Sequence, residues 1–456
     1  MIAAGDVRTR TRKSLRKRPG RARLGDAPMP CTREQNSKRI VFSRSNCKSA
    51  ALQLGIKWGM ADRQYDAIVI GGGLLGSAVA YALSRNKRNS ALLIDARGKG
   101  HSDGSSHGHS RIIRTVASES PHFGAMARES FQRMQKMNRP GQFVAGPVDA
   151  LFMSFVASNE FKEMARRNNK PILSDRAILE KWGIQLPETG VGIVDDFSGI
   201  LDPAALLDIF YDEIGAGNIL WETAVASWDA NAAGVSVTTV KGETYIAAKL
   251  VLAAGGWLPA LLASGSVDAR VSDRLSRMTV ERIPLYYFDY PGSMPSVIPV
   301  TLFDNGHPDM YAMPEFDHPI ATPAEERPRY LKVGFHRGTV ATTPEEVDRK
   351  VHPHEQDRAI TYMRDRLGLN LTLDHTGLCL YAMPPDLRVS KETEAYNELP
   401  LIGELPGTQS VFLVAYGGGI CAKHALAIGD QVCAMLVQGT KPDYKDFDPL
   451  DRLRLS

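Results

Sequence analysis

Residues 66–76, DAIVIGGGLLG, decide the fold of this chain. An apolar strand runs into a group of glycines, a helical segment follows over 77–84, and residues 91–95, ALLID, form a second apolar strand. Glycines at such a turn let backbone N–H groups approach a pyrophosphate at the N-terminus of the helix. The stretch predicts a βαβ unit of a dinucleotide-binding domain, with Gly71, Gly73 and Gly76 at the cofactor.

Asp95 narrows the choice of dinucleotide. It lies 19 residues beyond Gly76, at the end of the second strand, where a carboxylate can accept hydrogen bonds from both hydroxyls of an adenosine ribose. The same carboxylate would repel a 2'-phosphate, so NADP is disfavoured. Gly and Asp also favour ordinary turns at strand ends. A further buried strand that leads into residues 253–257, AAGGW, predicts a second segment passing close to the nucleotide domain.

The composition is that of a globular protein. The 456 residues are 43% hydrophobic and 23% charged, which allows two lobes. No apolar run approaches the roughly 20 residues that cross a bilayer, so we expect no membrane association of the catalytic body. Residues 1–59 hold 15 Lys and Arg against 3 Asp and Glu, while the rest of the chain carries 40 against 48. The basic balance belongs to this extension and indicates no nucleic-acid partner.

Residues 1–59 form a basic segment that we expect to be disordered. Three interpretations stay open: translation starts at Met60, the segment targets an organelle, or it is a solvated tail.

The five cysteines show no C-x-x-C spacing, which favours a reducing compartment. We therefore expect a cytoplasmic protein, unless residues 1–59 direct it to an organelle. His101, His107 and His109 lack carboxylate or cysteine partners at ligand spacing, and no metal site is expected.

Several further motifs resemble one family, the FAD-dependent amine oxidases of the D-amino-acid oxidase superfamily that include monomeric sarcosine oxidase, pipecolate oxidase and N-methyltryptophan oxidase. The resemblance extends from Met60 to the C-terminus. Its most specific parts are SSHGHSRIIR and the cysteine motif. The matching segments are residues 105–114 (SSHGHSRIIR), 182–184 (WGI), 198–203 (SGILDP), 311–314 (YAMP), 332–336 (KVGFH), 379–381 (CLY) and 417–419 (GGG) with Lys423.

The resemblance implies a cofactor and a substrate anchor. FAD is the cofactor, and Cys379 corresponds to the thiol that joins the flavin 8α-methyl group; an ordinary buried thiol is the alternative. Arg114 and Lys423 correspond to cations that bind a substrate carboxylate, to which Arg offers a planar fork and Lys a compact charge. Structural ion pairs are the alternative reading of these two cations.

The resemblance also implies catalytic positions. Lys332 corresponds to a lysine whose charge stabilises developing superoxide when O₂ is reduced, and His336 to a histidine beside the substrate. Strand alternation over 330–336 places both side chains on one face of the strand. The alternative interpretation is a surface strand whose outer face is polar. The remaining assignments are His107 and Arg111 beside the flavin, and the pocket aromatics Tyr311 and Tyr381, for which plain packing is the alternative.

The expected fold is α/β: a Rossmann-like FAD-binding domain in discontinuous segments, and a substrate domain built on an antiparallel sheet that carries Tyr311 and Lys332. The FAD lies between the two. The expected division is the basic extension at 1–59, FAD-binding segments at 60–143, 198–274 and 378–456, and substrate-domain segments at 144–197 and 275–377.

The expected reaction is oxidation of a secondary or N-methyl amino acid to an imine, with O₂ reduced to H₂O₂, by a monomer. The sequence departs from the family in residues 382–403 and in GGICAK at 418–423, so the preferred amine stays open. Three alternatives also stay open: a fructosyl-amino-acid oxidase, a dehydrogenase that passes electrons to another acceptor, and a flavin-containing assembly protein without turnover.

Overall fold

The computed structural model describes residues 64–449, except 87, 117–120, 138–142, 290–299, 304–308, 316–329, 337, 385–398 and 443–447. The extension at 1–59 and most of the altered segment after Tyr381 lie outside the described residues. In the part described, no helix is both long enough and apolar enough to cross a membrane.

The first sheet contains the predicted βαβ unit. Its central strands are parallel, and their side chains are apolar on both faces, as buried parallel strands require. β17 pairs antiparallel with β18 at one edge, and the β8–β9 hairpin pairs with β10. The strand order is β17 (Leu401–Glu404), β18 (Val411–Ala415), β10 (Thr244–Leu252), β1 (Gln64–Ile70), β2 (Ala91–Ile94) and β7 (Ile219–Leu220), with β8 (Val225–Asn231) and β9 (Gly234–Thr239) attached.

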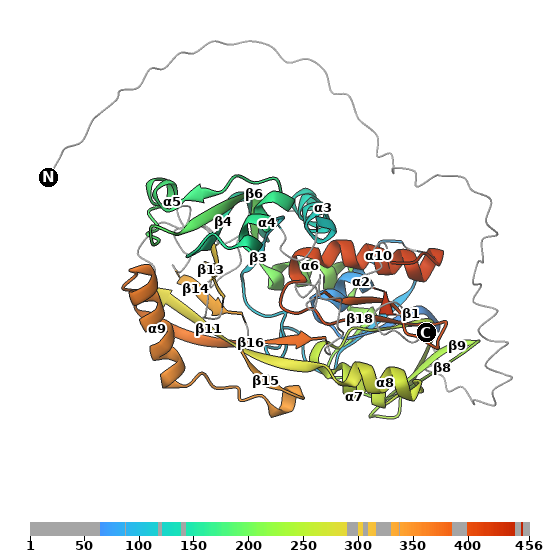
Figure 1. The fold of residues 1–456 in the computed structure, drawn as a ribbon. Helices are drawn as coiled ribbons and strands as arrows, with labels where there is room; N and C mark the ends of the chain where they lie inside the picture. Colours follow the sequence, from blue (N-terminus) through green and yellow to red (C-terminus); the bar gives the residue numbers. More distant parts are fainter. Residues whose placement is uncertain are drawn as a thin grey trace, which may run out of the picture. The chain divides into compact units, whose positions relative to one another are not determined.

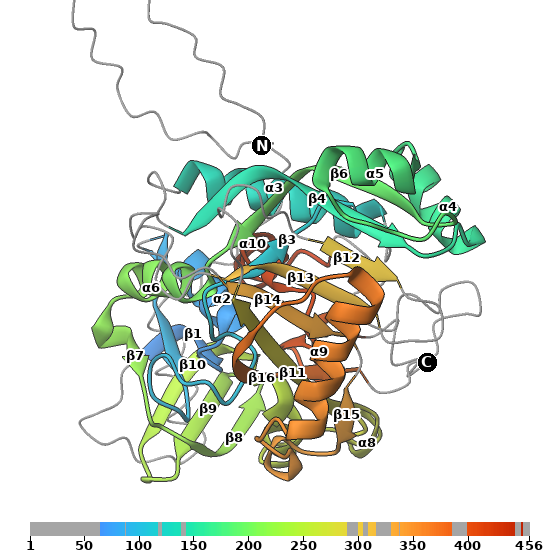
Figure 2. The same ribbon diagram turned by 90° about the vertical axis from the view of Figure 1, so that its left-hand side faces the viewer.

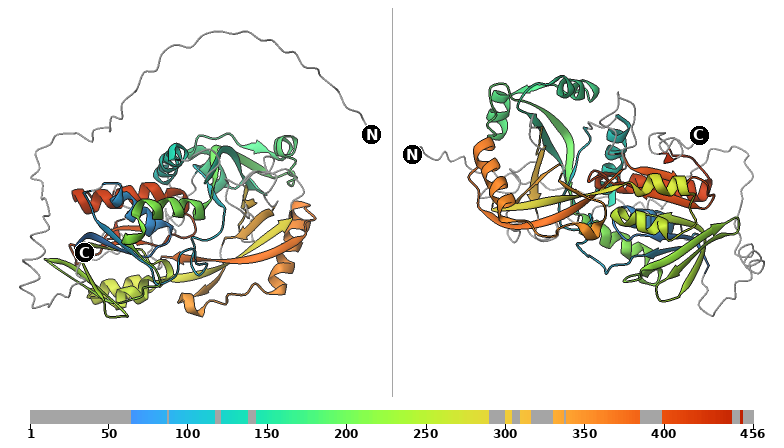
Figure 3. Two further views of the ribbon diagram at one scale, coloured as in Figure 1. Left: turned by 180° about the vertical axis from the view of Figure 1, so that it is seen from behind. Right: turned by 60° about the horizontal axis from the view of Figure 1, so that its bottom comes forward.

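Helices cover both faces of this sheet (Figures 1 and 3). Alternate residues of β1 point to opposite sides: Val69 belongs to the core under α2 and α10, and Ile68 to the core with α7 and α8. The first core includes residues of α2 (Leu74–Ser84), α3 (Pro121–Met137), α6 (Pro203–Ile214) and α10 (Ala425–Gln438); the second includes residues of α7 (Leu258–Ala263) and α8 (Ala269–Ser276).

The second sheet is mainly antiparallel, and β4 and β12 form a parallel pair within it. Its strand order is β15 (Thr339–Ala341), β11 (Thr279–Asp289), β14 (Tyr330–Phe335), β13 (Met310–Glu315), β12 (Val300–Phe303), β4 (Val144–Ser154), β6 (Val191–Leu201) and β3 (Arg111–Ile113), with β16 (Leu373–Met383) on β11 and β5 (Leu173–Ser174) on β6. The associated helices are α4 (Asn159–Arg167), α5 (Asp175–Trp182) and α9 (Pro353–Leu367).

The two faces of the second sheet have different roles. Figure 2 shows α9 lying across one face, where Ala359 and Met363 pack against Leu331 and Val333 of β14. Because strand residues alternate, Lys332 points to the opposite face. Tyr311 and Met313 of β13 pair with Gly334 and Lys332 of β14 and share that second face. The alternation therefore separates a structural core from a row of candidate functional side chains.

The predicted fold class is confirmed: an α/β nucleotide-binding sheet from discontinuous segments is joined to a second, largely antiparallel sheet. Short 3₁₀ turns complete the connections at η1 (Ala216–Asn218), η2 (Gly255–Trp257), η5 (Pro344–Glu346) and η7 (Ala422–His424). β6 runs across the expected domain limit at 197/198, and β16 across that at 377/378. The division into domains stays a prediction.

Candidate active site

The glycine turn between β1 and α2 has no room for side chains. Gly71 has a φ of 114°, and a Cβ there would overlap the carbonyl oxygen of Ala253, just after β10. A Cβ at Gly76 would overlap the carbonyl oxygen of Gly71. Gly73 is the N-cap of α2 and has no side-chain cap. The chain that leaves β10 therefore lies in contact with the glycine turn, as the sequence indicated. The N-terminus of α2 lies next to this contact.

Asp95 is tied to this turn by its carboxylate. Oδ2 accepts a hydrogen bond from the backbone N–H of Gly72 at 2.5 Å, and Oδ1 accepts one from that of Arg97 at 2.7 Å. Ser106, which sequence reasoning did not single out, accepts a hydrogen bond from the N–H of Leu74 at 2.9 Å. The serine fixes the 105–111 loop against the first turn of α2.

One cavity of about 400 Å³ connects the nucleotide loop with most of the candidate residues. Of the predicted site residues, only Gly76 and His107 are not part of its wall. The predicted residues that line it are Gly71, Gly73, Asp95, Arg111, Arg114, Tyr311, Lys332, His336, Cys379, Tyr381 and Lys423. Segments far apart in the sequence thus meet around a single volume.

The charges around the cavity suit an anionic dinucleotide and an anionic substrate. Among the described lining residues, Asp95 is the one carboxylate, and the cations are Arg97, Arg111, Arg114, Lys332 and Lys423. Gly71 and Gly73 line the cavity at the N-terminus of α2, where a pyrophosphate can approach the backbone. The residues present therefore fit FAD, with its diphosphate at the turn and its ribose at Asp95.

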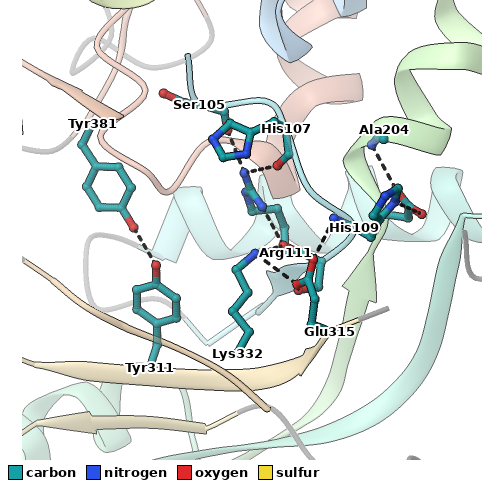
Figure 4. Close-up of polar contacts among 11 residues, drawn as sticks. Ser105, His107, His109, Arg111, Ala204, Tyr311, Glu315, Lys332 and Tyr381 are labelled. Atoms are coloured by element: carbon teal, nitrogen blue, oxygen red, sulfur yellow. Dashed lines mark hydrogen bonds and ion pairs between the residues drawn. The ribbon is translucent and has the colours of Figure 1, made fainter. Parts of the chain in front are cut away.

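Lys332 and Glu315 form a buried ion pair beside the cavity (Figure 4). The ammonium Nζ of Lys332 lies 3.1 Å from Glu315 Oε2 and donates to the carbonyl of Ser110 at 3.1 Å. Their side chains are 2% and 5% exposed. Burial lowers the pKa of Lys332, and the Glu315 carboxylate opposes that effect. Burial works against the charge of Glu315 too, but Lys332 and the hydrogen bond from Ser110 outweigh it and lower the pKa of Glu315.

Arg111 organises the loop that precedes it. Its guanidinium donates to the carbonyl oxygens of Ser110 at 2.7 Å and of Ser105 and His107 at 2.8 Å each. His107 lies half-buried beside it, and its buried Nε2 atom has no hydrogen-bond partner among the described residues. Burial, together with the charges of Arg111 and Lys332, lowers the pKa of His107 to about 4. The imidazole is therefore neutral near pH 7.

Tyr311 and Tyr381 meet inside the cavity through their hydroxyl groups, which are 3.4 Å apart (Figure 4). Burial raises the pKa of Tyr311 to about 12 and that of Tyr381 well above its usual value, so both phenols are neutral and can donate hydrogen bonds. His336 follows the end of β14, and its ring centroid lies 5.0 Å from that of Tyr311. These three aromatic side chains line one part of the cavity wall.

The remaining candidates reach the cavity from other elements. Cys379 on β16 is a buried free thiol. Lys423 in η7 is 2% exposed, and its Nζ lies 5.3 Å from the centroid of the Phe123 ring. Arg114 follows β3, with its guanidinium carbon 5.5 Å from the centroid of the Phe152 ring. Arg114 and Lys423 thus line the cavity, and each also makes a cation–π contact with an aromatic ring.

Sequence reasoning missed Glu315, the carboxylate partner of Lys332. It also missed Ser105, whose hydroxyl donates to the carbonyl of Leu380 beside Cys379, and Cys421, a second buried thiol that lines the cavity. Strand alternation was the available signal for Glu315, because it follows Tyr311 and Met313 at every second position of β13.

A nucleotide loop and a cluster of cations and aromatics around one cavity define the class: an FAD-dependent oxidoreductase. The chain belongs to the FAD-dependent oxidoreductase family known as DAO, which matches residues 66–435.

Curated relatives cover most of the chain. It is 29% identical over 351 residues to a probable sarcosine oxidase of Arabidopsis thaliana, covering 71% of this chain and 79% of the relative. It is 26% identical over 407 residues to a monomeric sarcosine oxidase of Bacillus sp. (strain B-0618), covering 84% and 95%. It is 26% identical over 404 residues to an N-methyl-L-tryptophan oxidase of Shigella flexneri serotype 5b, covering 85% and 98%.

Solved structures share the fold at lower identity. The L-proline dehydrogenase of P. horikoshii superposes with a TM-score of 0.68 at 17% identity, covering 86% of this chain and 99% of that chain. NikD, an amino acid oxidase of nikkomycin biosynthesis, superposes in its open form with a TM-score of 0.64 at 19% identity, covering 86% and 97%. These likenesses support the fold alone.

Proposed function

We propose that this protein oxidises a secondary or N-methyl amino acid to an imine and passes the electrons to O₂, which forms H₂O₂. The observation that carries the proposal is the single cavity that joins Gly71 and Asp95 to Arg114 and Lys423. The relatives named as sarcosine oxidase and N-methyl-L-tryptophan oxidase support a methylated amino acid as substrate. FAD, when bound, supplies the acceptor for the hydride equivalent that leaves the substrate.

The substrate carboxylate would bind Arg114 and Lys423. Lys423 is 2% exposed, and a buried ammonium gains more from an anion than one in water. Arg114 offers a planar pair of donors that fixes the carboxylate in one orientation. Two fixed cations would hold the substrate carbon in one position relative to the cofactor, which is how positioning contributes to rate.

Neutral Tyr311 and Tyr381 would line the space for the rest of the substrate. Their hydroxyls can donate to a substrate lone pair because both phenols keep their protons at physiological pH. Their rings, with His336, form an aromatic part of the cavity wall, from which a bound substrate would displace water. Exclusion of water strengthens the attraction between the bound carboxylate and the two cations.

Lys332 would act in the second half of the reaction, in which O₂ accepts the electrons. A fixed ammonium group in the cavity wall stabilises the negative charge that develops as O₂ accepts electrons. We assign His107 and Arg111 to the same end of the cavity: Arg111 as a fixed positive charge beside the flavin, and His107 as its neutral neighbour. We also propose that Cys379 would hold the cofactor through a thioether to the flavin 8α-methyl carbon. Forming this bond would remove one proton from the thiol and one from the methyl group, and the two electrons would pass to the flavin and then to O₂.

A second candidate function follows from the Lys332–Glu315 pair. A carboxylate 3.1 Å from the ammonium cancels part of the field that would assist O₂ reduction. A dehydrogenase that uses another electron acceptor is therefore the main competitor. Mixing the FAD-loaded protein with N-methyl amino acids while recording O₂ uptake and H₂O₂ separates the two: consumption of O₂ matched by H₂O₂ supports the oxidase, and flavin reduction without either supports the dehydrogenase.

We further propose a monomeric cytoplasmic enzyme, divided into domains at the limits expected from the sequence. The name of the Bacillus relative, monomeric sarcosine oxidase, supports the monomer. Light scattering of the purified protein tests it, and a mass twice that of the 49.9 kDa chain would contradict it.

A further inference from the structure

Glu315 is a buried carboxylate to which sequence reasoning assigned no role. It ends β13 and is 4% exposed. Oε1 accepts a hydrogen bond from the backbone N–H of His109 at 2.9 Å, and Oε2 accepts one from the Ser110 hydroxyl and contacts the Lys332 ammonium. Figure 4 shows the carboxylate between the 105–111 loop and Lys332. It is therefore fixed from three directions.

Lys332 depends on this carboxylate for its charge. A buried ammonium without a counter-ion is strongly disfavoured and loses its proton. The charged and titratable groups around Lys332 are Arg111 of β3, His107 of the preceding loop, Tyr287 of β11, Cys379 of β16, and Glu315. Arg111 and a protonated His107 would repel an ammonium. Among the described neighbours, Glu315 is the acidic group that forms an ion pair with Lys332.

We propose that Glu315 is a positioning residue that keeps Lys332 protonated and holds its ammonium group at the cavity wall. This proposal deepens the proposed function, because it explains how a fully buried lysine supplies a permanent charge there. It rests on the proposed function for the step that Lys332 assists, but the ion pair itself can be tested without that step.

Removal of the Glu315 carboxylate should make the stability of the protein depend on pH. In Glu315→Gln, Lys332 keeps Arg111 as a neighbour and loses its counter-ion, so its pKa falls further. The unfolded chain still binds that proton up to about pH 10.4. Because the unfolded state then holds more protons than the folded state, the stability of the variant rises with pH over this window. The difference in melting temperature between the parent and Glu315→Gln should therefore shrink as the pH is raised.

The first experiment measures melting temperatures of the FAD-loaded parent, Glu315→Gln, Lys332→Met and the double variant from about pH 6 to about pH 9. We expect the deficit of Glu315→Gln to narrow across this range, and the double variant to melt above Glu315→Gln at the low end because no unpaired ammonium remains. Ser110→Ala is the matched control: it removes one hydrogen bond to Glu315, keeps both charges, and should show a deficit independent of pH. A constant deficit in Glu315→Gln would overturn the proposal.

The second experiment follows reoxidation of the reduced flavin by O₂ over the same pH range. The parent rate should stay flat, and the Glu315→Gln rate should fall about tenfold per pH unit above the new pKa of Lys332 until it reaches the Lys332→Met rate. Glu315→Asp should restore a flatter profile. A Glu315→Gln rate equal to the parent rate over the whole pH range would overturn the proposal.

The two experiments distinguish an error in the proposed function from an error in the role of Glu315. If the parent itself is not reoxidised by O₂, the oxidase part of the proposed function is wrong, and the melting temperatures still decide whether Glu315 keeps Lys332 charged. If the melting temperatures show no coupling while reoxidation is fast, the oxidase stands and the role of Glu315 is wrong.

Discussion

The hydroxyl groups of Tyr311 and Tyr381, on β13 and β16, lie 3.4 Å apart in the cavity, and each ring packs against a glycine that leaves no room for a methyl group. A Cβ at Gly334 would overlap the ring of Tyr311, and one at Gly419 would overlap the ring of Tyr381. The shape of the cavity wall therefore depends on two positions that carry no functional group.

Gly419→Ala should damage both stability and binding. Gly419 has a φ of 75°, so alanine is strained there by about 1–2 kcal/mol, and its methyl group must also displace Tyr381. Gly407→Ala is the matched control, with a φ of 85° and open space around it. Denaturant unfolding and titration with a carboxylate inhibitor provide the measurement. Equal losses in the two variants would contradict the packing role of Gly419.

Cys379→Ala should release the flavin. In the parent, flavin should remain with the protein after acid precipitation, because the thioether survives acid, and in the variant it should appear in the supernatant. Cys421→Ala, which removes the other buried thiol of the same cavity, should retain it. Colourless precipitate from the parent would exclude a covalent bond and leave noncovalent FAD in place.

Arg114→Gln and Lys423→Met should each weaken a carboxylate inhibitor. Loss of one charge-assisted contact costs about 1.5–3 kcal/mol, or roughly 10- to 150-fold in affinity. The dissociation constants can be read from the flavin spectrum at one ionic strength, since salt screens exposed charges. Lys249→Met, outside the cavity wall, serves as the control. Unchanged affinity in both cavity variants would mean that the substrate is not held through these cations.

Lys332→Met should slow reoxidation of the reduced flavin by O₂ far more than its reduction by substrate. The charge acts on electron transfer to oxygen and leaves the C–H bond of the substrate untouched. Stopped-flow measurement of the two half-reactions separates these steps. Similar slowing of both would show that Lys332 acts mainly on the structure of the cavity.

His107→Gln should reduce the loss of stability in acid. Because the folded pKa of His107 is lowered to about 4, the unfolded chain binds the proton more tightly between about pH 4 and 6.5. This contribution to stability is complete above that window and is lost as the pH falls through it, by on the order of 3 kcal/mol. Unfolding curves of the parent and the variant between pH 7 and 4 measure the difference, and identical slopes would contradict it.

The sequence predicted the parts of the fold whose determinants lie close together in the chain. Gly71 and Asp95 belong to a βαβ unit of about thirty residues, where strand, turn and helix patterns follow directly from one another. Alternation over 330–336 likewise predicted that Lys332 and His336 reach the same cavity. The location of Cys379 in the cavity wall came from a resemblance, because no local pattern connects it to the nucleotide loop.

The contacts between residues far apart in the chain were beyond sequence reasoning. Ser110 and Glu315 are 205 residues apart, and Ser105 and Leu380 are 275 residues apart. Pro314, next to Glu315, also weakens the strand pattern, because proline is uncommon within sheets. Alternation places Glu315 on the face of Tyr311 and Met313, but only the pairing of β13 with β14 brings that face to Lys332.

Anaerobic mixing of the FAD-loaded protein with N-methyl and secondary amino acids tests the central claim most directly. We expect at least one of them to bleach the visible absorption of the flavin before oxygen is admitted, and O₂ to restore the absorption with formation of H₂O₂. A flavin that stays oxidised with every such amino acid, while the protein still binds FAD, would contradict amino-acid oxidation at this site.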